Sequence, residues 1–553
     1  MESAAPVYAE YSGLDDHSIE DVDDYAPGGL HPTHLGDLLG DGRYKVILKL
    51  GHGGYGTVWL CRDVKEGTWR AVKILKASNS SEDCPDLRIQ SAFSNIDHSQ
   101  KDVRNCRVAL ALGHFWTNGP NGTHLCIVMP LLGPNLDNAA QLYLYDEAPL
   151  VRICFQLVQA MSFLHNKGVC HGDFRPHNAC FTLKDIDNLE EDDIIQAFGK
   201  PKLIGLVEDE EFDAVDYGDT ESDAFSDEES HESVRSDETK MAGNAASHYK
   251  KPQAHRPRYL VATSCINPKS PYVSNEVAVI DFGVSFLVSE PPEESMIPPH
   301  YGAPETFIDK CGDLGFGSDL WALGCTICEI RVGCEPFFDV GDIWHLMKYW
   351  ENLNGPLPEP YRSSLAEDLE IPEDPEQYVS TDSEEIEELA QEHLRRTGVT
   401  GSLHNILLVE RRFQVPLREG EEPSPPPPPT SSTRGRMQVI SGHKIVAAEM
   451  TRREASELME LFKRIFAWKA SERISASEIL DLPYFAACRA ETEGASESQQ
   501  MSGENADVDS ASQAGADATV SWHGDSGNEA LVPLGGIGPL LALLRELLRP
   551  CGL

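Results

Sequence analysis

Apolar and polar residues alternate in short stretches near the start of the chain, which is the pattern of half-buried strands. Residues 43–60 predict two strands around a glycine turn, because Tyr44, Val46 and Leu48 alternate with other positions, and residues 69–75 predict a third strand. Residues 151–165 instead place apolar side chains at helical spacing. A small sheet followed by a helical body predicts an α+β protein in two lobes, at residues 25–128 and 129–487.

Two low-complexity segments interrupt the predicted helical lobe. The first, at residues 205–255, is acidic, and the second, at 378–449, contains five consecutive prolines at 425–429. We expect both to be inserts without a packed core. The proline run predicts an extended polyproline helix, which would either dock an SH3-like or WW-like module or act as a stiff spacer. Residues 1–24 and 488–530 are small, polar and acidic, so we expect disordered ends.

The last part of the chain departs from this polar composition. A stripe of leucines lies between Pro539 and Pro550 and predicts a short helix at 539–549. Two interpretations remain open: the helix binds a partner's groove, or it folds back onto the body of the protein. The stripe is too short to cross a bilayer, and no other segment approaches the roughly twenty apolar residues of a membrane span.

Charge and cysteine usage narrow the class of protein further. The 553 residues carry a net charge of −44, much of it between residues 208 and 238, which disfavours nucleic acid and anionic membranes as partners. The 14 cysteines show no repeated spacing, so we expect a reducing compartment without structural disulfides. Cys325 and Cys328 lie in an apolar run and are predicted to be buried helix residues, not zinc ligands.

Two separate sequences carry the chemistry of phosphoryl transfer. The first reads His-Gly-Asp-Phe-Arg-Pro-His-Asn at residues 171–178, and the second reads Asp-Phe-Gly at 281–283. Asp173 would orient a substrate hydroxyl, and Asn178 and Asp281 would hold Mg²⁺ through oxygen ligands. Arg175 would stabilise charge on the transferred phosphoryl group, and Pro176 favours a serine/threonine enzyme over a tyrosine enzyme. The expected catalytic residues are Asp173, Lys73, Arg175 and Asn178, and the expected metal ligands are Asn178 and Asp281.

A glycine-rich hairpin near the start of the chain predicts the nucleotide site. Gly51, Gly53 and Gly56 stand in G-x-G-x-x-G positions between two strands, where backbone N–H groups could approach a triphosphate. Lys73 follows on the next strand and would neutralise phosphate oxygens. Residues 126–133 would form the hinge behind adenine. The expected ATP contacts are Leu50, Gly51, His52, Gly53, Gly54, Tyr55, Gly56, Thr57, Val58, Ala71, Lys73, Met129, Pro130 and Leu132.

Three further residues fit structural roles in such an enzyme. Glu305, in the triplet Ala-Pro-Glu at 303–305, is expected to pair with Arg473. Asp319 is expected to be buried and to brace the catalytic loop. The ordered set of glycine loop, lysine, H-x-D-x-x-x-x-N, D-F-G and A-P-E is highly specific for a protein kinase.

In these motifs the chain resembles the serine/arginine-protein kinases, in particular their fungal members. The resemblance rests on Asp-Tyr at 24–25, Gly-Gly-Leu-His-Pro at 28–32, Gly-Asp-Leu at 36–38, Leu-Gly at 50–51, Thr-Val-Trp-Leu-Cys at 57–61, Asn-Gly-Thr-His-Leu-Cys at 121–126, the catalytic-loop and D-F-G sequences, and residues 315–325. It implies a bilobal kinase fold, ATP and Mg²⁺ as cofactors, and Arg/Ser-rich protein substrates such as mRNA-processing factors. It also implies a cytoplasmic and nuclear location, and we expect a monomer.

The chain departs from the common kinase pattern at three positions, and two of them leave a second function open. Gly172 replaces the arginine of H-R-D, as it does in the resembled family, so we expect activity without phosphorylation of the activation segment. Asp86 stands where a glutamate usually pairs with the strand lysine, here Lys73. Gly302 stands where relatives have arginine. Asp86 and Gly302 favour the alternative of a pseudokinase or scaffold that binds partners without phosphorylating them.

Overall fold

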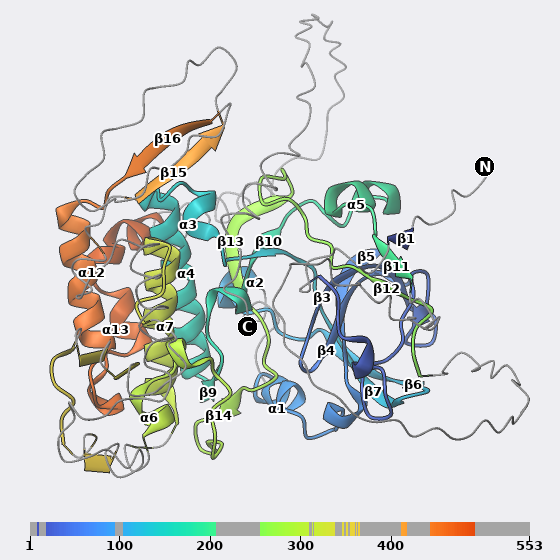
Figure 1. Cartoon of the computed structure of the whole chain (residues 1–553), viewed down its shortest axis with the longest axis horizontal. Helices are drawn as coiled ribbons and strands as arrows, with labels where there is room; N and C mark the ends of the chain where they lie inside the picture. The colour runs from blue at the N-terminus through green and yellow to red at the C-terminus, as the bar shows by residue number, and fades with distance from the viewer. Residues whose placement is uncertain are drawn as a thin grey trace, which may run out of the picture. The chain divides into compact units, whose positions relative to one another are not determined.

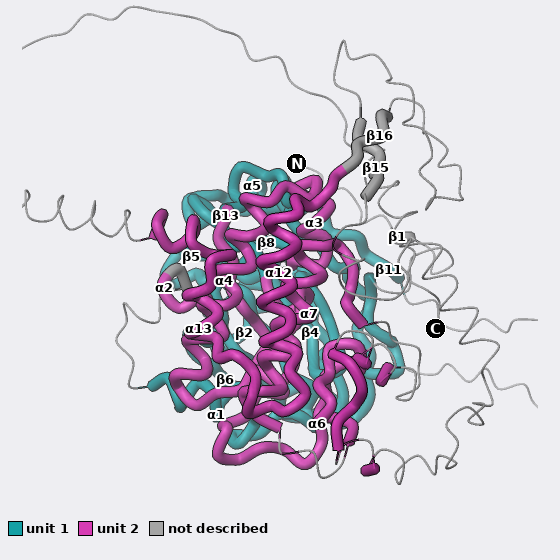
Figure 2. Tube along the Cα trace, turned by 90° about the vertical axis from the view of Figure 1, so that its left-hand side faces the viewer, with its two compact units in different colours: residues 1–103, 108–134, 180–274 teal, residues 104–107, 135–179, 275–553 magenta. Residues whose placement is uncertain are grey.

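The computed structural model describes residues 8–9, 18–94, 103–205, 255–308, 314–337, 354–359, 411–416 and 443–492, with a few further positions between 312 and 407 (Figure 1). The chain divides into two compact units, which Figure 2 shows in different colours. Unit 1 contains residues 1–103, 108–134 and 180–274, and unit 2 contains residues 104–107, 135–179 and 275–553. Unit 1 is rich in strands and unit 2 in helices, in agreement with the predicted α+β architecture.

Unit 1 is built on a six-stranded antiparallel sheet in the order β2-β3-β4-β5-β7-β6. Its strands are β2 (Leu38–Leu39), β3 (Tyr44–Gly53), β4 (Gly56–Asp63), β5 (Thr68–Leu75), β6 (Gly113–Gly119) and β7 (Gly122–Pro130). The three strands predicted from the alternating pattern are therefore confirmed as β3, β4 and β5. Helix α1 (Pro85–Ala92) follows β5 and begins with proline at its first position, where a missing N–H costs nothing.

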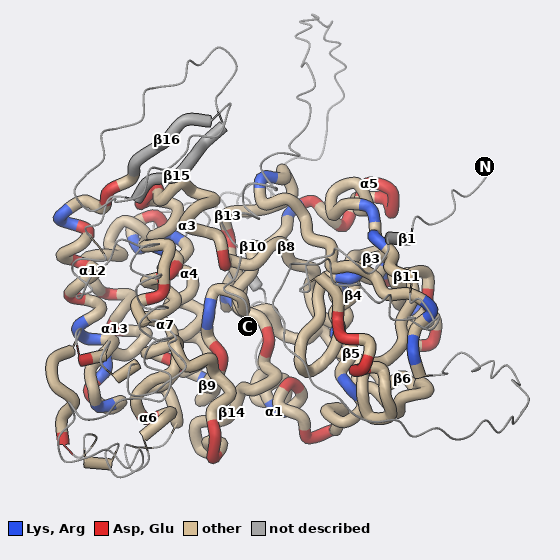
Figure 3. Tube along the Cα trace, viewed as in Figure 1, with Lys and Arg blue, Asp and Glu red and all other residues tan. Residues whose placement is uncertain are grey.

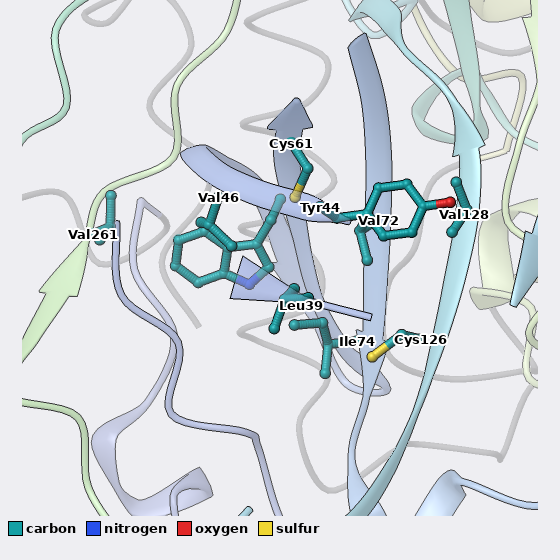
Figure 4. Packing of buried hydrophobic residues seen from close by; sticks show 10 residues of the cluster. Leu39, Tyr44, Val46, Cys61, Val72, Ile74, Cys126, Val128 and Val261 are labelled. Carbon is teal, nitrogen blue, oxygen red and sulfur yellow. The ribbon is translucent and has the colours of Figure 1, made fainter. Parts of the chain in front are cut away.

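One face of this sheet buries a compact apolar cluster (Figure 4). Tyr44, Val46 and Cys61 meet Val72 and Ile74 from the neighbouring strands. Burial removes the apolar surface of these side chains from water, which favours folding of this unit. Val261, far along the chain, packs into the same cluster.

The two ends of the acidic insert also belong to unit 1, which corrects the predicted lobe boundary. Helix α5 (Glu191–Phe198) and strands β11 (Leu203–Gly205) and β12 (Tyr259–Val261) lie in the predicted helical lobe, yet they group with the sheet. Ile194, Phe198 and Ile266 pack against Leu48 and Trp69 of the sheet. Figure 3 shows the acidic residues of α5, whose first turn contains Glu191, Asp192 and Asp193 and so complements the helix dipole.

The N-terminal segment is ordered earlier than the composition predicts. We expected disorder to residue 24, but Ile19 and Glu20 are 7% and 4% exposed. Ile19 packs with Tyr25, Leu30 and residues of β11 and β12, and Glu20 accepts a hydrogen bond from the Tyr25 hydroxyl and pairs with Lys49. The acidic composition of this segment concealed one buried carboxylate that has a cationic partner.

Unit 2 is organised around two long helices. Helix α4 (Glu147–His165) begins four residues before the predicted helix, and α7 (Phe316–Val332) is buried over most of its length. Further helices are α3 (Ala139–Leu142), α6 (Pro304–Phe307), α12 (Arg452–Ile465) and α13 (Ala476–Leu480), and most of the four-residue α2 (Val103–Cys106) is also assigned to unit 2. Cys325 and Cys328 are buried free cysteines of α7, as predicted.

Several short strands form separate small sheets. β9 (Val169–Cys170) pairs with β14 (Phe286–Leu287), and β1 (Tyr8–Ala9) pairs with β11. A separate three-stranded sheet has the order β13-β10-β8, from Val273–Val279, Ala179–Leu183 and Leu132–Asn135. None of the described helices combines the length and the apolar character that a membrane crossing requires.

The predicted proline-rich insert is partly structured. Strands β15 (Arg411–Pro416) and β16 (His443–Ala448) lie within residues 378–449 and pair antiparallel, from Arg411 opposite Ala448 to Pro416 opposite His443. Apolar residues alternate in β15 at Phe413 and Val415, which is a strand pattern that the low-complexity neighbourhood concealed. The proline run itself and the leucine stripe at 539–549 lie outside the described residues.

Candidate active site

The glycine-rich hairpin of unit 1 has the geometry that its sequence predicts. Strands β3 and β4 pair up to Gly53 and Gly56, which leaves only Gly54 and Tyr55 in the turn. A Cβ on Gly56 would lie 2.2 Å from the carbonyl oxygen of Ile74, so only glycine fits beside β5. A Cβ on Gly51, Gly53 or Gly54 would meet nothing within 4 Å. Packing within the described protein therefore does not explain these three glycines, whereas the close approach of a phosphate group would.

The other predicted nucleotide residues lie on neighbouring strands of the same sheet, except Leu132, which begins β8. The register places Val58 of β4 opposite Lys73 of β5, and Ala71 of β5 opposite Met129 of β7. Pro130 ends β7, and Leu132 begins β8. Thr57 is fully buried, and its hydroxyl accepts a hydrogen bond of 2.9 Å from the Trp59 indole. Thr57 therefore has a structural role within the hairpin.

Lys73 has the acidic partner that the sequence assigned to it. Its Nζ lies 3.4 Å from Oδ1 of Asp86, in the first turn of α1, and the two side chains are 9% and 11% exposed. The shorter aspartate thus reaches the lysine, through one long contact.

In unit 2 the catalytic loop brings three predicted residues together. The Asp173 carboxylate accepts hydrogen bonds from Arg175 Nε, at 3.1 and 3.2 Å, and from Asn178 Nδ2, at 2.7 Å. Asn178 Nδ2 also donates to the backbone oxygen of Asp173, at 2.8 Å. These contacts fix the direction of the carboxylate, which is the property that a group orienting a substrate hydroxyl needs.

The loop is connected to the D-F-G sequence through His171. Asp173 N–H donates to His171 Nδ1 at 3.2 Å, so the ring proton lies on Nε2, which donates to the Ile280 carbonyl at 3.0 Å. Ile280 N–H in turn donates to the Asn178 carbonyl at 2.9 Å, which brings the residue before Asp281 to the catalytic loop. The H-x-D pattern marked His171, but it did not predict this bridging role.

Asp281 itself has an unusual backbone. Its φ is +66°, a left-handed conformation that costs energy for a residue other than glycine. Its Oδ1 accepts a 3.3 Å hydrogen bond from the N–H of Gly283, and the Phe282 ring packs against the His171 ring with centroids 5.4 Å apart. Strained residues of this kind are frequent at functional sites.

Asp319 braces the catalytic loop from below, as predicted. It is 3% exposed and accepts hydrogen bonds from the backbone N–H groups of His171 and Gly172, at 2.7 and 3.0 Å. His165 Nε2 lies 3.1 Å from the same carboxylate. Ser285, which no sequence signal marked, donates to the His171 carbonyl at 2.6 Å.

Gly172 has a steric reason to replace arginine. Its φ is +80°, and a Cβ at this position would lie 2.7 Å from the carbonyl oxygen of Val284. A side chain of any size is therefore strained at this point of the loop. The departure from H-R-D is part of the backbone path, so the loop is built without an arginine that could bind a phosphorylated residue.

The predicted anchor of the activation segment is present. Arg473 donates to both oxygens of Glu305, at 2.6 and 2.8 Å, and both side chains are almost completely buried. Gly302 stands where related kinases have arginine. It lies tightly against Phe307, because a Cβ on Gly302 would come within 2.5 Å of the Phe307 ring. Both the anchor and Gly302 are thus explained by packing in unit 2.

One buried carboxyl of α7 lies close to these residues. Glu329 accepts a hydrogen bond from the Tyr301 hydroxyl, and burial raises the pKa of Glu329 to about 8, with nearby Glu335 adding to the rise. Burial also raises the pKa of the Tyr301 hydroxyl. Among the described residues, no three His, Cys, Asp or Glu side chains gather as metal ligands.

Comparisons with known proteins agree with this arrangement. The model of the protein kinase domain matches residues 44–187 and 271–485. The chain is 30% identical to the serine/threonine-protein kinase SKY1 of Saccharomyces cerevisiae over 200 residues, which are 34% of this chain and 26% of that protein. It is 31% identical to SRSF protein kinase 3 of Homo sapiens over 189 residues, 33% of each chain. These alignments span only about a quarter to a third of the two relatives.

Two further similarities extend over more of the chain. The serine/threonine-protein kinase SRPK of Physarum polycephalum is 26% identical over 325 residues, which are 58% of this chain and 67% of that protein. A crystal structure of a kinase domain aligns with 82% of this chain and 98% of its own, at 16% identity and a TM-score of 0.47.

Proposed function

The chain belongs to the protein kinase domain family, and from this premise we propose that it is an active serine/threonine protein kinase, which transfers the γ-phosphate of ATP to protein hydroxyls. The observation that carries the proposal is the Asp173 carboxylate, which Arg175 and Asn178 hold in one direction. A residue that only stabilised the fold would not need this orientation.

The nucleotide would be bound by unit 1. Gly51, Gly53 and Gly54 leave open space beside backbone N–H groups, and the charge of Lys73 would neutralise phosphate oxygens. Asn178 and Asp281 supply the hard oxygen ligands that suit Mg²⁺. When bound, the metal would neutralise charge on the phosphates.

The residues of unit 2 would act on the acceptor. Asp173 would accept a hydrogen bond from the substrate hydroxyl and orient its oxygen for attack. Arg175 would donate to the transferred phosphoryl group, where negative charge is concentrated. The hydrogen bonds of Asp319 to the loop N–H groups would keep both side chains in place as the substrate binds.

The substrates we propose are Arg/Ser-rich proteins, including mRNA-processing factors. SRSF protein kinase 3 and the Physarum SRPK support this class by their similarity, and a net charge of −44 favours basic partners. We also propose a monomer that works in both cytoplasm and nucleus. Activity should not depend on phosphorylation of the activation segment, because Gly172 offers no anchor for it.

The scaffold alternative was founded on Asp86 and Gly302. The Lys73–Asp86 contact and the packing of Gly302 against Phe307 remove both reasons to expect an inactive site. We therefore do not retain a second function.

The test is transfer of radiolabelled phosphate from ATP and Mg²⁺ to an Arg-Ser repeat peptide. We expect the wild type to label the peptide, before and after phosphatase treatment, and Asp173→Ala to lose about 10²–10⁴-fold in rate. Asp193→Ala, on the exposed start of α5, is the matched control and should retain full activity. If the wild type bound ATP in the presence of Mg²⁺ but labelled neither this peptide nor general protein substrates, the scaffold reading would replace the proposal.

A further inference from the structure

A surface groove of about 750 Å³ lies in unit 2, away from the catalytic loop in the sequence. One wall is a face of α12, and the other is the turn at residues 482–484. We call the apolar residues of its lining the apolar floor; they are Ala455, Met459, Leu482, Pro483 and Tyr484. Nothing in the proposed reaction uses this groove.

Charged residues border the apolar floor. Arg452 and Lys463 stand at the two ends of the α12 face, and Glu457 and Glu460 lie between them. The face runs for twelve residues, from 452 to 463, and its ends are about 17 Å apart along the helix axis. A volume of several hundred Å³ with an apolar floor and a polar border suits an apolar helix face.

The leucine stripe near the end of the chain has this shape. At 100° per residue, the leucines at 540, 541, 543, 544, 547 and 548 would occupy less than half of a helix circumference. The opposite side would carry Ala542, Arg545, Glu546 and Arg549. Residues 540–549 would span about 14 Å, close to the length of the α12 face. So short a helix is marginal alone in water and needs a surface to cover its leucines.

The position of the groove in the chain favours this segment as its occupant. Tyr484, at the groove, is only eight residues from Thr492, where the described residues end, so these two points are at most about 28 Å apart. The 47 residues between Thr492 and Leu540 would span about 40 Å as a random coil, enough to return. A tether of this kind gives an effective concentration of about 1 mM, so a weak contact suffices.

We propose that residues 539–549 form a helix that docks its leucine face into the groove between α12 and residues 482–484 of the same chain. The arginines at 545 and 549, on the opposite side of this helix, would remain exposed to water. The docked segment would cover Met459 and Leu482 from water and make the C-terminal part of the chain an intramolecular ligand of unit 2.

Amide hydrogen exchange on the full chain tests the proposal. With an intrinsic dissociation constant of about 0.1 mM, the docked state would be populated about tenfold over the free state, so exchange at 540–549 should slow about tenfold. Leu544→Asp, at the centre of the leucine face, should remove this protection. Ala542→Asp, on the opposite side, carries the same charge change and should retain it.

The groove can be altered independently of the tail. Met459→Asp should abolish protection of residues 540–549, whereas Arg453→Ala, on an exposed part of the same helix, should leave it unchanged. Thermal unfolding of Met459→Asp shows whether α12 remains folded; if it does not, Leu482→Asp replaces it.

Three results would overturn the proposal. Exchange at 540–549 at the rate of an unstructured peptide would show that the segment does not dock and awaits an external partner. Protection that Met459→Asp leaves intact in a folded chain would place the segment elsewhere. Protection that grows with protein concentration, together with a dimer in sedimentation velocity, would assign the groove to the tail of a second copy.

Discussion

The two units each hold a charge pair that the sequence predicted, and the two pairs are built differently. In unit 1, Nζ of Lys73 lies 3.4 Å from Oδ1 of Asp86. In unit 2, Arg473 donates to both oxygens of Glu305 and also to the backbone carbonyls of Ala467, Gly317 and Trp468. The guanidinium additionally lies 5.0 Å from the centre of the Trp321 ring.

This difference separates a fixed pair from an adjustable one. A bidentate pair in a buried site has almost no alternative geometry, because each lost contact would leave a buried charge unpaired. A single long contact between flexible side chains can be broken and remade at little cost. We infer that unit 2 uses its pair for stability, whereas the Lys73–Asp86 pair of unit 1 can lengthen or break at little cost.

The largest expected effect comes from breaking the fixed pair. Arg473→Ala leaves Glu305 as an uncompensated buried charge, so we expect a loss of about 3–5 kcal/mol in the free energy of unfolding. Chemical denaturation measures this. Arg453→Ala is the control, because its contact with Glu147 is 3.4 Å long and Arg453 is 73% exposed; it should change stability by less than about 1 kcal/mol. Equal losses of stability in Arg473→Ala and Arg453→Ala would show that the buried pair is no more important for folding than an exposed one.

The adjustable pair should show the opposite balance between activity and stability. On the proposed function, Lys73→Met removes a charge that would neutralise phosphate oxygens, so we expect phosphate transfer to fall about 10²–10³-fold with little change in the free energy of unfolding. Lys76→Met is the control. It breaks a 2.8 Å contact between Lys76 and Asp24, also in unit 1, and should retain activity. A loss of stability in Lys73→Met as large as that of Arg473→Ala would contradict an adjustable pair.

A third measurement asks how rigid the catalytic loop is. Gly172 and Gly168 both have positive φ, but a Cβ would clash only at Gly172. Gly168→Ala should cost about 1–2 kcal/mol from its backbone conformation alone, and Gly172→Ala about 1–3 kcal/mol more. Denaturation of both variants gives the difference directly. Equal losses of stability in Gly168→Ala and Gly172→Ala would show that the loop can move away from Val284 and is not rigid.

The stability of unit 2 should also depend on pH, through the buried carboxyl of Glu329, which accepts a hydrogen bond from the Tyr301 hydroxyl. The pKa of Glu329 is raised from 4.5 to about 8, so between these values the folded state binds more protons than the unfolded state. The free energy of unfolding should therefore fall as pH rises through this window, by at most about 1.4 kcal/mol per pH unit. Glu329→Gln should flatten the dependence, whereas Glu335→Gln should largely preserve it. A curve that is the same in wild type and Glu329→Gln would show that this group does not titrate as described.

Local patterns predicted much of the fold. Alternation at residues 44–48 and the glycines at 51–56 correctly gave β3 and β4, and helical spacing gave α4. The burial of Ile19 and Glu20 was not predictable in this way, because it depends on Lys49 and on residues of β11 and β12 that are distant in sequence. The contacts of Phe198 and Ile266 with the sheet were missed for the same reason.

The site was predictable wherever a motif fixes a short spacing. Asp173 and Asn178 are five residues apart on one loop, so their contact follows from the sequence. The anchor between Glu305 and Arg473 was predicted through the resemblance to kinases, although 168 residues separate the two. The strained backbone of Asp281 and the Ser285 hydrogen bond depend on backbone angles, which side-chain identities do not encode.

The antiparallel pairing of β11 with β12 has a consequence for chain engineering. Gly205 stands opposite Tyr259, so residues 206–254 leave and return at neighbouring points of one sheet. The entropy of closing such a loop grows only with the logarithm of its length, and each doubling costs about 0.6 kcal/mol. The segment can therefore be exchanged for a shorter linker, or for a reporter domain whose two ends are equally close together. The length of the inserted chain should change the stability of the surrounding fold very little.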